Sequence, residues 1–180
     1  MVYFLFFLIS GVFSETASYF MAQARMNDLW VLHIHHAIEF GLLMYVLARW
    51  QRQPVIRSLE LLLIPIYLSF WLVSIFTYEK LTSPAEYTHT LSSTILIAAS
   101  IATLFGLMKG EDRILYADHK FWVCAGVLVY FTSNIMLFLF INRITGLSVT
   151  EAISVWSIHW VLDIISNVLY TVGFLCLART

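Results

Sequence analysis

Residues 29–50 read LWVLHIHHAIEFGLLMYVLARW, and this stretch decides the fold class. As a helix with a rise of about 1.5 Å per residue it would be about 33 Å long, which suffices to cross a hydrocarbon layer of about 30 Å. Nearly all of its side chains are apolar, yet His33, His35, His36 and Glu39 lie within it. The stretch therefore predicts a transmembrane helix that carries an ionisable cluster.

Five further stretches share this length and apolar character. Together with 29–50, they predict transmembrane helices at about 2–22, 59–78, 88–108, 120–142 and 154–178. The first stretch lacks the basic leader and the small-residue cleavage site of a signal peptide, so we expect it to be a retained helix. The polar segments between the stretches are too short for a soluble domain. We predict an all-α fold, an integral membrane bundle of six transmembrane helices that forms a single domain over residues 1–180.

The composition supports a membrane protein and excludes several other classes. Of the 180 residues, 61% are hydrophobic and 12% are charged, whereas a soluble domain is about 45 to 50% apolar and about 25% charged. The formal net charge is −1, so the chain lacks the basic field that a nucleic-acid-binding protein needs. The high apolar content also excludes a disordered chain. The two Cys residues are too few for a disulfide framework.

The basic residues alternate in number from one connecting segment to the next. Cytoplasmic loops of membrane proteins are enriched in Lys and Arg. Alternate segments and the carboxyl end together hold seven basic residues, which are Arg49, Arg52, Arg57, Lys109, Arg113, Lys120 and Arg179. The other segments hold three, which are Arg25, Lys80 and Arg143. We therefore predict that both termini lie in the cytoplasm.

Ionisable and amide side chains inside the predicted helices are the candidate functional residues. A charged residue in a span costs about 2.5 to 3.5 kcal/mol on insertion scales, so its presence needs a reason. Under the predicted orientation the candidates occupy one layer in the outer half of the membrane, and they are Glu15, His35, His36, Glu39, Asn134, His159, Asp163 and Asn167. By contrast, the third and fourth stretches carry hydroxyl and edge groups, among which we place His89.

Helical spacing groups the candidates on shared faces. His35 and His36 precede Glu39 by four and three residues, so all three side chains can lie on one face of a helix. The segment 159–167 places a His, an Asp and an Asn in turn at four-residue steps. The arrangement with the lowest free-energy cost turns these two faces and the face that carries Glu15 toward one another, away from lipid. This arrangement predicts a polar pocket that faces the outer side of the membrane.

Such a pocket suits a metal ion or a proton. Neutral imidazole and carboxylate together are ligands for divalent ions such as Zn, Fe or Mn. His35, Glu39, His159 and Asp163 would supply two nitrogen and two oxygen ligands, with Glu15 as a further ligand or as an acid next to the ligands. The same residues without a metal would bind a proton, because His titrates between about pH 5 and 8. A bis-His haem fits less well, since a carboxylate four residues after each His sits badly against an apolar macrocycle.

The favoured interpretation is a non-enzymatic transporter or sensor that binds a proton, a metal ion or a small cation. Two alternatives come from other classes. In an intramembrane metal-dependent hydrolase, a metal held by His would activate water and Glu39 would act as the base. In a structural subunit, the polar layer would only fix helix packing. The expected partners are the lipid bilayer and a second copy or another membrane subunit, with no nucleic acid.

Three segments carry a resemblance to known proteins: HHAIEF (35–40), FWVCAGVLVYFTSN (121–134) and WSIHWVLDIISNVLY (156–170). Together they resemble a loose group of short bacterial polytopic membrane proteins to which no activity is assigned. The resemblance extends over nearly the whole chain, through mostly hydrophobic motifs. It implies a multi-pass protein of the bacterial cytoplasmic (inner) membrane, and it supplies no catalytic residues.

Overall fold

The computed structural model describes residues 2–109, 115–139 and 149–178, and most of these residues are helical. The elements are α1 (Val2–Gln23), α2 (Leu29–Trp50), α3 (Pro54–Thr77), α4 (Glu86–Met108), the short 3-10 helix η1 (Leu115–Ala117), α5 (His119–Leu139) and α7 (Val149–Ala178). Among the described residues, six helices are long and apolar enough to cross a membrane. The all-α class with six candidate transmembrane helices is therefore confirmed, and the chain is a multi-pass membrane protein.

Two helices begin earlier than the sequence indicated. α3 begins at Pro54 instead of residue 59, because proline has a suitable φ for the first turn of a helix and needs no partner for an N–H. α7 begins at Val149 instead of residue 154, and Glu151 in its first turn interacts favourably with the positive end of the helix dipole. Residues 140–142 of the fifth predicted stretch lie outside the described residues. Because both helices start early, they include polar residues that the sequence analysis assigned to the connections.

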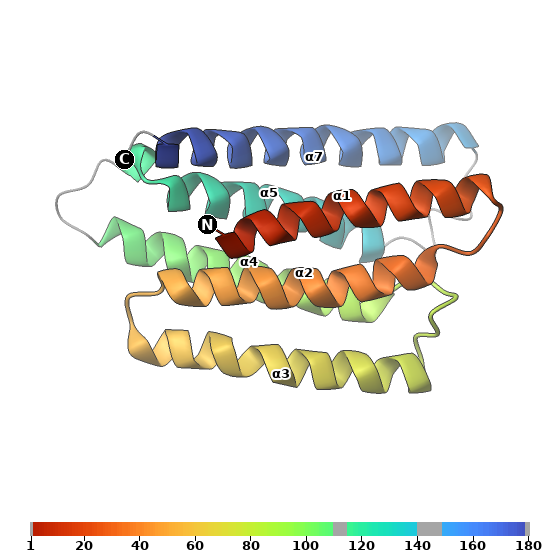
Figure 1. The fold of residues 1–180 in the computed structure, drawn as a ribbon, viewed down its shortest axis with the longest axis horizontal. Coiled ribbons are helices and arrows are strands. Elements are labelled where there is room, and N and C mark those ends of the chain that lie inside the picture. The colour runs from red at the N-terminus through yellow and green to blue at the C-terminus, as the bar shows by residue number, and fades with distance from the viewer. Residues whose placement is uncertain (1, 110–114, 140–148, 179–180) are drawn as a thin grey trace.

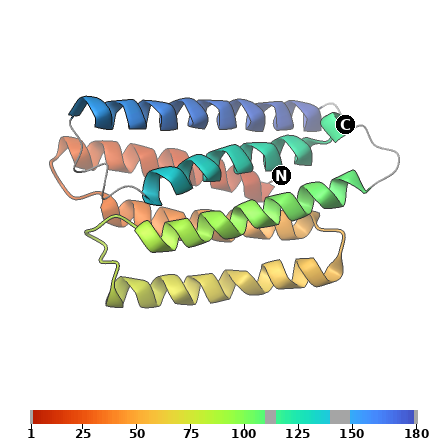
Figure 2. The same ribbon diagram turned by 180° about the vertical axis from the view of Figure 1, so that it is seen from behind.

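The helices form two rows, with one further helix along each edge of the bundle. In Figure 1, α1 and α2 lie in front, and Figure 2 shows α5 and α4 on the opposite side. α7 runs along one edge next to α5, and α3 runs along the other edge next to α2. α2 contacts α1, α3 and α4, so it is a central helix of the bundle.

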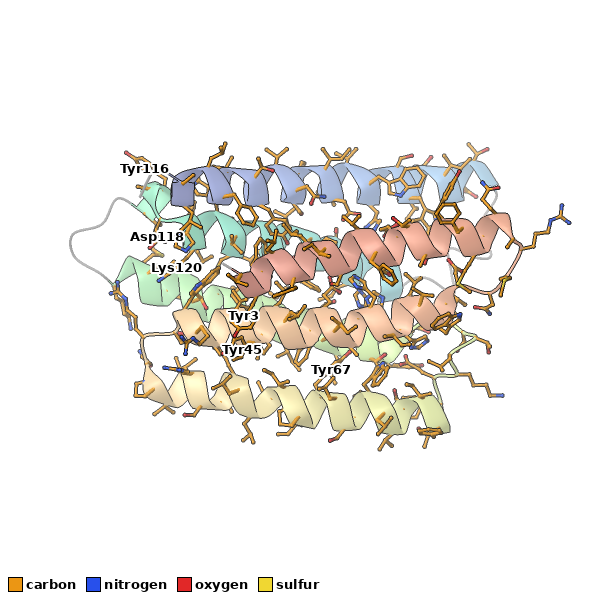
Figure 3. The ribbon with its side chains drawn as sticks, viewed as in Figure 1. Tyr3, Tyr45, Tyr67, Tyr116, Asp118 and Lys120 are labelled. Atoms are coloured by element: carbon orange, nitrogen blue, oxygen red, sulfur yellow. The ribbon has the colours of Figure 1, made fainter. Side chains whose placement is uncertain are left out.

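The two ends of the bundle differ in what they hold. The start of α1 and the end of α7 lie at the same end, which we call the terminal end (Figure 1). Tyr116, Asp118 and Lys120 also mark this end in Figure 3. The α1–α2 and α3–α4 connections lie at the opposite end, which we call the far end. An even number of passes thus returns the chain to the side from which it starts.

α2 forms the centre of the core. Its side chains Phe40, Leu43, Met44 and Leu47 are almost fully buried. Tyr67 extends from α3 toward α2 (Figure 3), and the centroid of its ring lies 4.0 Å from that of Phe40. Large apolar side chains also cover much of the outer surface of the other helices, as a lipid environment requires. The residues of α2 are therefore held more rigidly by packing than those of the outer helices.

α5 and α7 approach each other closely at two glycines. A Cβ atom at Gly126 would lie 2.7 Å from Cδ1 of Tyr170 and 3.2 Å from the carbonyl oxygen of Ser166. A Cβ atom at Gly173 would lie 3.2 Å from the carbonyl oxygen of His119. Small residues at such positions let the backbones of membrane helices come together. Gly126 and Gly173 thus set the distance between α5 and α7.

A buried carboxylate caps the start of α4. Glu79, in the connection between α3 and α4, accepts hydrogen bonds from the backbone N–H groups of Tyr87 and Thr88 and from the Thr88 hydroxyl. The first N–H groups of a helix have no partner within the helix, and they carry partial positive charge. Glu79 therefore satisfies these groups and fixes the connection at the far end.

Replacing Glu79 with Ala should destabilise the protein by about 1 to 2 kcal/mol, which is comparable to the loss of an N-terminal cap. Thermal unfolding in detergent measures the effect as a lowered midpoint. Asp28→Ala is the matched control, because Asp28 precedes α2 and its side chain makes no capping hydrogen bond within the described residues. Equal midpoints for the two variants would show that Glu79 does not hold α4 in place.

Candidate functional site

A buried carboxylate lies near the middle of α2. Glu39 is 1% exposed and lies about 15 Å along the axis from the start of the helix, which is deep in the membrane if α2 spans it. One turn earlier, the Nδ1 atom of His36 lies 3.4 Å from the Oε2 atom of Glu39. Residues three apart on a helix are neighbours on its surface, which explains this contact.

A second imidazole reaches the same place from α4. His89 is 0% exposed, and its ring centroid lies 3.9 Å from that of His36, with 31° between the ring planes. One potential ligand atom from each of His36, Glu39 and His89 lies within 4.8 Å of the other two. We call these three residues the buried triad. Two helices thus place two imidazoles and one carboxylate around a single point.

One distance within the buried triad is close to the separation of two ligands around a tetrahedral metal ion. Bonds of about 2.05 Å from zinc to His nitrogen and carboxylate oxygen place two ligands about 3.3 Å apart in a tetrahedral site. The distance of 3.4 Å between His36 Nδ1 and Glu39 Oε2 matches this separation. Three protein ligands would leave one coordination position for water or another group.

A pocket lies next to the buried triad, among α1, α2, α5 and α7. Its volume is about 570 Å³, within the range of about 300 to 1,000 Å³ that is usual for small-molecule sites. Its polar lining consists of Glu15, Thr16, His35, Glu39, Asp163, Ser166 and Asn167. The remaining lining consists of Phe7, Leu8, Gly11, Val12, Tyr130 and Tyr170. We call this cavity the side pocket.

Glu39 belongs to both the buried triad and the side pocket. Its Oε2 atom lies beside His36, while its Oε1 atom has no hydrogen-bond partner among the described residues. Leaving a buried carboxylate oxygen without a partner costs free energy. This arrangement indicates a group that binds a proton or a cation. Glu39 is therefore the chemical link between the two features.

α7 contributes a second pair of His and carboxylate. The Nε2 atom of His159 lies 3.2 Å from the Oδ2 atom of Asp163, one turn further along the helix. The Asn167 side chain donates a hydrogen bond to the Asp163 backbone carbonyl at 2.9 Å. In the part of the chain that the structure describes, the Oδ1 atom of Asp163 has no hydrogen-bond partner. The lining of the side pocket thus includes a second carboxylate, one oxygen of which has no hydrogen-bond partner among the described residues.

The predicted site residues divide among the side pocket, the buried triad and the pair on α7. Five of them line the side pocket, namely Glu15, His35, Glu39, Asp163 and Asn167. Of the others, His36 belongs to the buried triad, and His159 pairs with Asp163. Asn134 is buried on α5, and the pocket lining does not include it. The layer expected from the sequence therefore separates into a pocket and a neighbouring cluster.

The compact cluster of potential ligands has different members from the predicted metal set. We expected His35, Glu39, His159 and Asp163 to hold an ion together. Within the described ranges, the cluster consists of the buried triad, so that Glu39 is joined by the neighbouring His36 and by a His from α4. Three members of the predicted set face the side pocket, and the set stays a prediction about that pocket.

Sequence reasoning missed His89, which we placed among the edge groups of a helix. It lies in the first turn of α4, where a side chain is usually close to water. The connection 78–85 packs against α2 there, and the Nε2 atom of His33 bonds to the Ser83 carbonyl oxygen at 2.8 Å. The signal available in the sequence was the spacing of His89 and Ser92, which are three residues apart and so share one face of a helix. Burial of His89 thus depends on tertiary packing against α2, where its ring lies on that of His36.

Sequence reasoning also missed Glu60 near the terminal end. Its side chain is 3% exposed, and its Oε1 atom accepts a hydrogen bond from Gln51 Nε2 at 2.8 Å. The same nitrogen donates to the Thr103 hydroxyl at 3.0 Å. The acidic residue within the run RSLELLLIP (57–65) was the available signal. This cluster joins α2, α3 and α4, and none of its residues lines the side pocket.

Comparison of the chain with protein-family models, with curated proteins and with solved structures finds no match. Its function must therefore be inferred from the chemistry of the buried triad and the side pocket.

Proposed function

We propose that this membrane protein binds a divalent metal ion at the buried triad and transports or senses that ion. The observation that carries the proposal is the convergence of His36, Glu39 and His89 at one buried point between α2 and α4. Two imidazoles and a carboxylate suit ions such as Zn²⁺, Fe²⁺ or Mn²⁺. The protein is not an enzyme under this proposal.

The cost of burying these groups supports a bound ion. Ionisable side chains in a membrane interior are expensive, and they commonly mark ion or proton pathways. Helix packing alone needs no charge, and α4 already carries the buried hydroxyl groups of Ser92 and Ser93 for that purpose. A metal ion would neutralise Glu39 and would use a nitrogen from each imidazole. Both interactions offset the cost of burial.

The side pocket would give cations a route to the buried triad. Glu15 is exposed at the edge of the pocket, and Asp163 is half-buried in its wall. Glu39 belongs both to the pocket lining and to the buried triad, so a cation could pass from one carboxylate to the next. Toward the terminal end, the buried side chains of Leu43 and Met44 fill the core of α2. Access from one side alone is what a sensor, or one state of a transporter, requires.

A three-ligand site also fits the intramembrane hydrolase alternative. The fourth coordination position of such a site can hold a water molecule that the metal activates. We expected Glu39 to act as the base in that reaction. Because Glu39 lies among the potential ligands, Asp163 or Glu15 would have to take that role.

Titration of Zn²⁺ into the purified protein in dodecyl maltoside, followed by elemental analysis, tests the metal proposal. We expect the wild-type chain to retain one zinc ion. His36→Gln and His89→Gln should each lower the zinc affinity about 100-fold or more, since even the loss of a residue that only orients a ligand costs about 10- to 100-fold.

His35→Gln is the matched control for this titration. His35 is adjacent to His36 on α2 but lies outside the buried triad, so zinc affinity should stay at the wild-type value. A loss in His35→Gln with none in His89→Gln would favour the ligand set predicted in the side pocket. If no preparation retained stoichiometric zinc, iron or manganese, the metal proposal would be wrong.

We also propose that the protein lies in a bacterial cytoplasmic membrane with its terminal end inside. The basic residues of the described ranges support this orientation. Those at or next to the terminal end are Arg49, Arg52, Arg57, Lys109 and Lys120, and those in the far-end connections are Arg25 and Lys80. Basic loops tend to remain in the cytoplasm. Arg113, Arg143 and Arg179 lie outside the described residues.

Labelling of single cysteines with a membrane-impermeant maleimide measures the orientation. In a chain whose Cys124 and Cys176 are replaced with Ser, Thr82→Cys at the far end should react in intact cells. Gln53→Cys at the terminal end should react only after the cells are opened. The opposite pattern would show that the terminal end faces outward.

A further inference from the structure

We propose that the side pocket binds an amphiphilic organic ammonium ion that enters from the lipid bilayer. The ammonium group would lie among the carboxylates, and its alkyl chain would leave the pocket along α1. This inference goes beyond the metal proposal, because it concerns another ligand and another set of side chains. Glu39 is the residue that both sites share.

The charge of the side pocket selects a cation. Glu15, Glu39 and Asp163 place three carboxylates in the lining, from three different helices. Within the described residues, His35 is the basic side chain of this lining. Carboxylates repel one another in a medium of low dielectric constant unless a proton or a cation lies between them. A bound cation would therefore stabilise the arrangement of α1, α2 and α7.

Aromatic rings in the same lining favour an organic cation over a bare metal ion. Phe7, Tyr130 and Tyr170 line the pocket together with the carboxylates. The face of an aromatic ring attracts alkylammonium groups, and sites that combine such rings recognise quaternary ammonium ions. A metal ion would instead need several oxygen or nitrogen ligands at short distances. The rings therefore fit the methyl groups of an ammonium ion.

The side pocket opens toward the side of the bundle. Glu15 and Asn167, on α1 and α7, are exposed residues of its lining. Glu15 lies about 12 Å from the far end of α1, which is the depth of lipid acyl chains in a transmembrane helix. Phe7 and Tyr170 are the lining residues nearest the terminal end on α1 and α7, and their ring centroids lie 6.2 Å apart. A ligand can therefore enter sideways from the bilayer.

A shallow apolar groove continues from the pocket along α1. Leu8 and Val12 line both cavities, and Ile9 and Phe13 belong to the groove. At Gly11, which lines the pocket, an added Cβ atom would meet nothing within 4 Å. Thr16 also lines both cavities, so the groove offers an alkyl chain a mostly apolar surface that starts at the side pocket. A small hydrated cation would make no use of it.

A second copy of the chain suits this opening less well than a cationic amphiphile. Most protein dimers are symmetric, so a dimer formed through α1 and α7 would bring the Glu15 residues of both copies into one interface. Like charges would then face each other at the depth of the acyl chains, where repulsion is strong. An ammonium ion neutralises Glu15 instead.

Photolabelling with an ammonium probe tests the proposal. The probe is a dodecyltrimethylammonium ion with a diazirine in its chain, and it is crosslinked to the purified protein in dodecyl maltoside and mapped by mass spectrometry. We expect labelled peptides from α1, and excess tetramethylammonium should reduce the label. Gly11→Leu, which fills the opening, and Glu15→Gln, which removes a charge, should each lower the labelling of α1 about tenfold.

Gly41→Leu is the matched control, because a Cβ atom at Gly41 also meets nothing within 4 Å and the pocket lining does not include this residue. It should keep the wild-type label. An alcohol with the same diazirine chain should label wild type and Glu15→Gln equally. If the alcohol labelled α1 as strongly as the ammonium probe, or if Gly41→Leu lost as much label as Gly11→Leu, the proposal would be overturned.

Zinc titration of the same variants separates this proposal from the metal proposal. Gly11→Leu and Glu15→Gln should keep the wild-type zinc affinity, because neither residue belongs to the buried triad. His89→Gln should lose zinc affinity and keep the ammonium label. Failure of one proposal is therefore distinguishable from failure of the other.

Discussion

Glu39→Gln should abolish zinc binding and, in the same protein, weaken labelling by the ammonium probe. Glutamine has nearly the same shape as glutamate and lacks its negative charge. Zinc affinity should fall about 100-fold or more, since the metal loses an anionic ligand. Ammonium labelling should fall about tenfold, because a residue of the pocket lining loses its negative charge. Metal titration and photolabelling of one preparation measure both effects.

Two single-site variants provide the comparison for Glu39→Gln. His89→Gln should affect zinc alone, and Glu15→Gln should affect the ammonium probe alone. Glu39→Gln should also unfold at a midpoint no lower than wild type, since a neutral amide costs less to bury than a carboxylate. Wild-type zinc affinity in Glu39→Gln would contradict the placement of this carboxylate in the metal site.

Gly126→Val should have the largest effect on the fold. A side chain at this position would collide with the ring of Tyr170 and press on the carbonyl oxygen of Ser166. Overpacking of a core costs about 1 to 3 kcal/mol, and we expect the upper part of that range because the added Cβ would also lie 3.2 Å from the backbone oxygen of Ser166. Tyr170 and Ser166 also line the side pocket, so ammonium labelling should fall along with stability. Thermal unfolding and photolabelling measure the two consequences.

Gly41→Val is the control for Gly126→Val, because it adds the same β-branched side chain to a helix where a Cβ atom meets open space. Its unfolding midpoint should stay close to that of wild type. If both variants unfolded at the same temperature, the loss of stability would come from the low helix propensity of valine. The contact between α5 and α7 would then not depend on Gly126.

The six helices could be predicted from the sequence because length and apolar character are local properties. A run such as 29–50 crosses a membrane whatever its neighbours are, so its identification needs no knowledge of packing. Helix starts depend on finer signals, and Pro54 at the first turn of α3 was overlooked for this reason. The carboxylates of the pocket were also predictable, since an acid inside an apolar run is visible without a structure.

The membership of the buried triad could not be predicted, because it depends on which way α2 faces. His35 and His36 are both within one turn of Glu39, and spacing alone does not distinguish them. Contact with α4 selects His36 over His35 for the buried triad, since it brings His89 against the ring of His36. His35 is directed to the side pocket instead. A rotation of about 100° between adjacent residues thus separates a residue of the buried triad from a residue that lines the side pocket.

The shared carboxylate would also make the two proposed binding sites compete. A metal ion at the buried triad and an ammonium ion in the side pocket would each neutralise the one charge of Glu39, so either ligand lowers the affinity for the other. Thermodynamic linkage requires the two reductions to be the same factor. Binding of a lipid-borne cation would therefore promote release of the metal ion, and α2 would act as the exchange element between them.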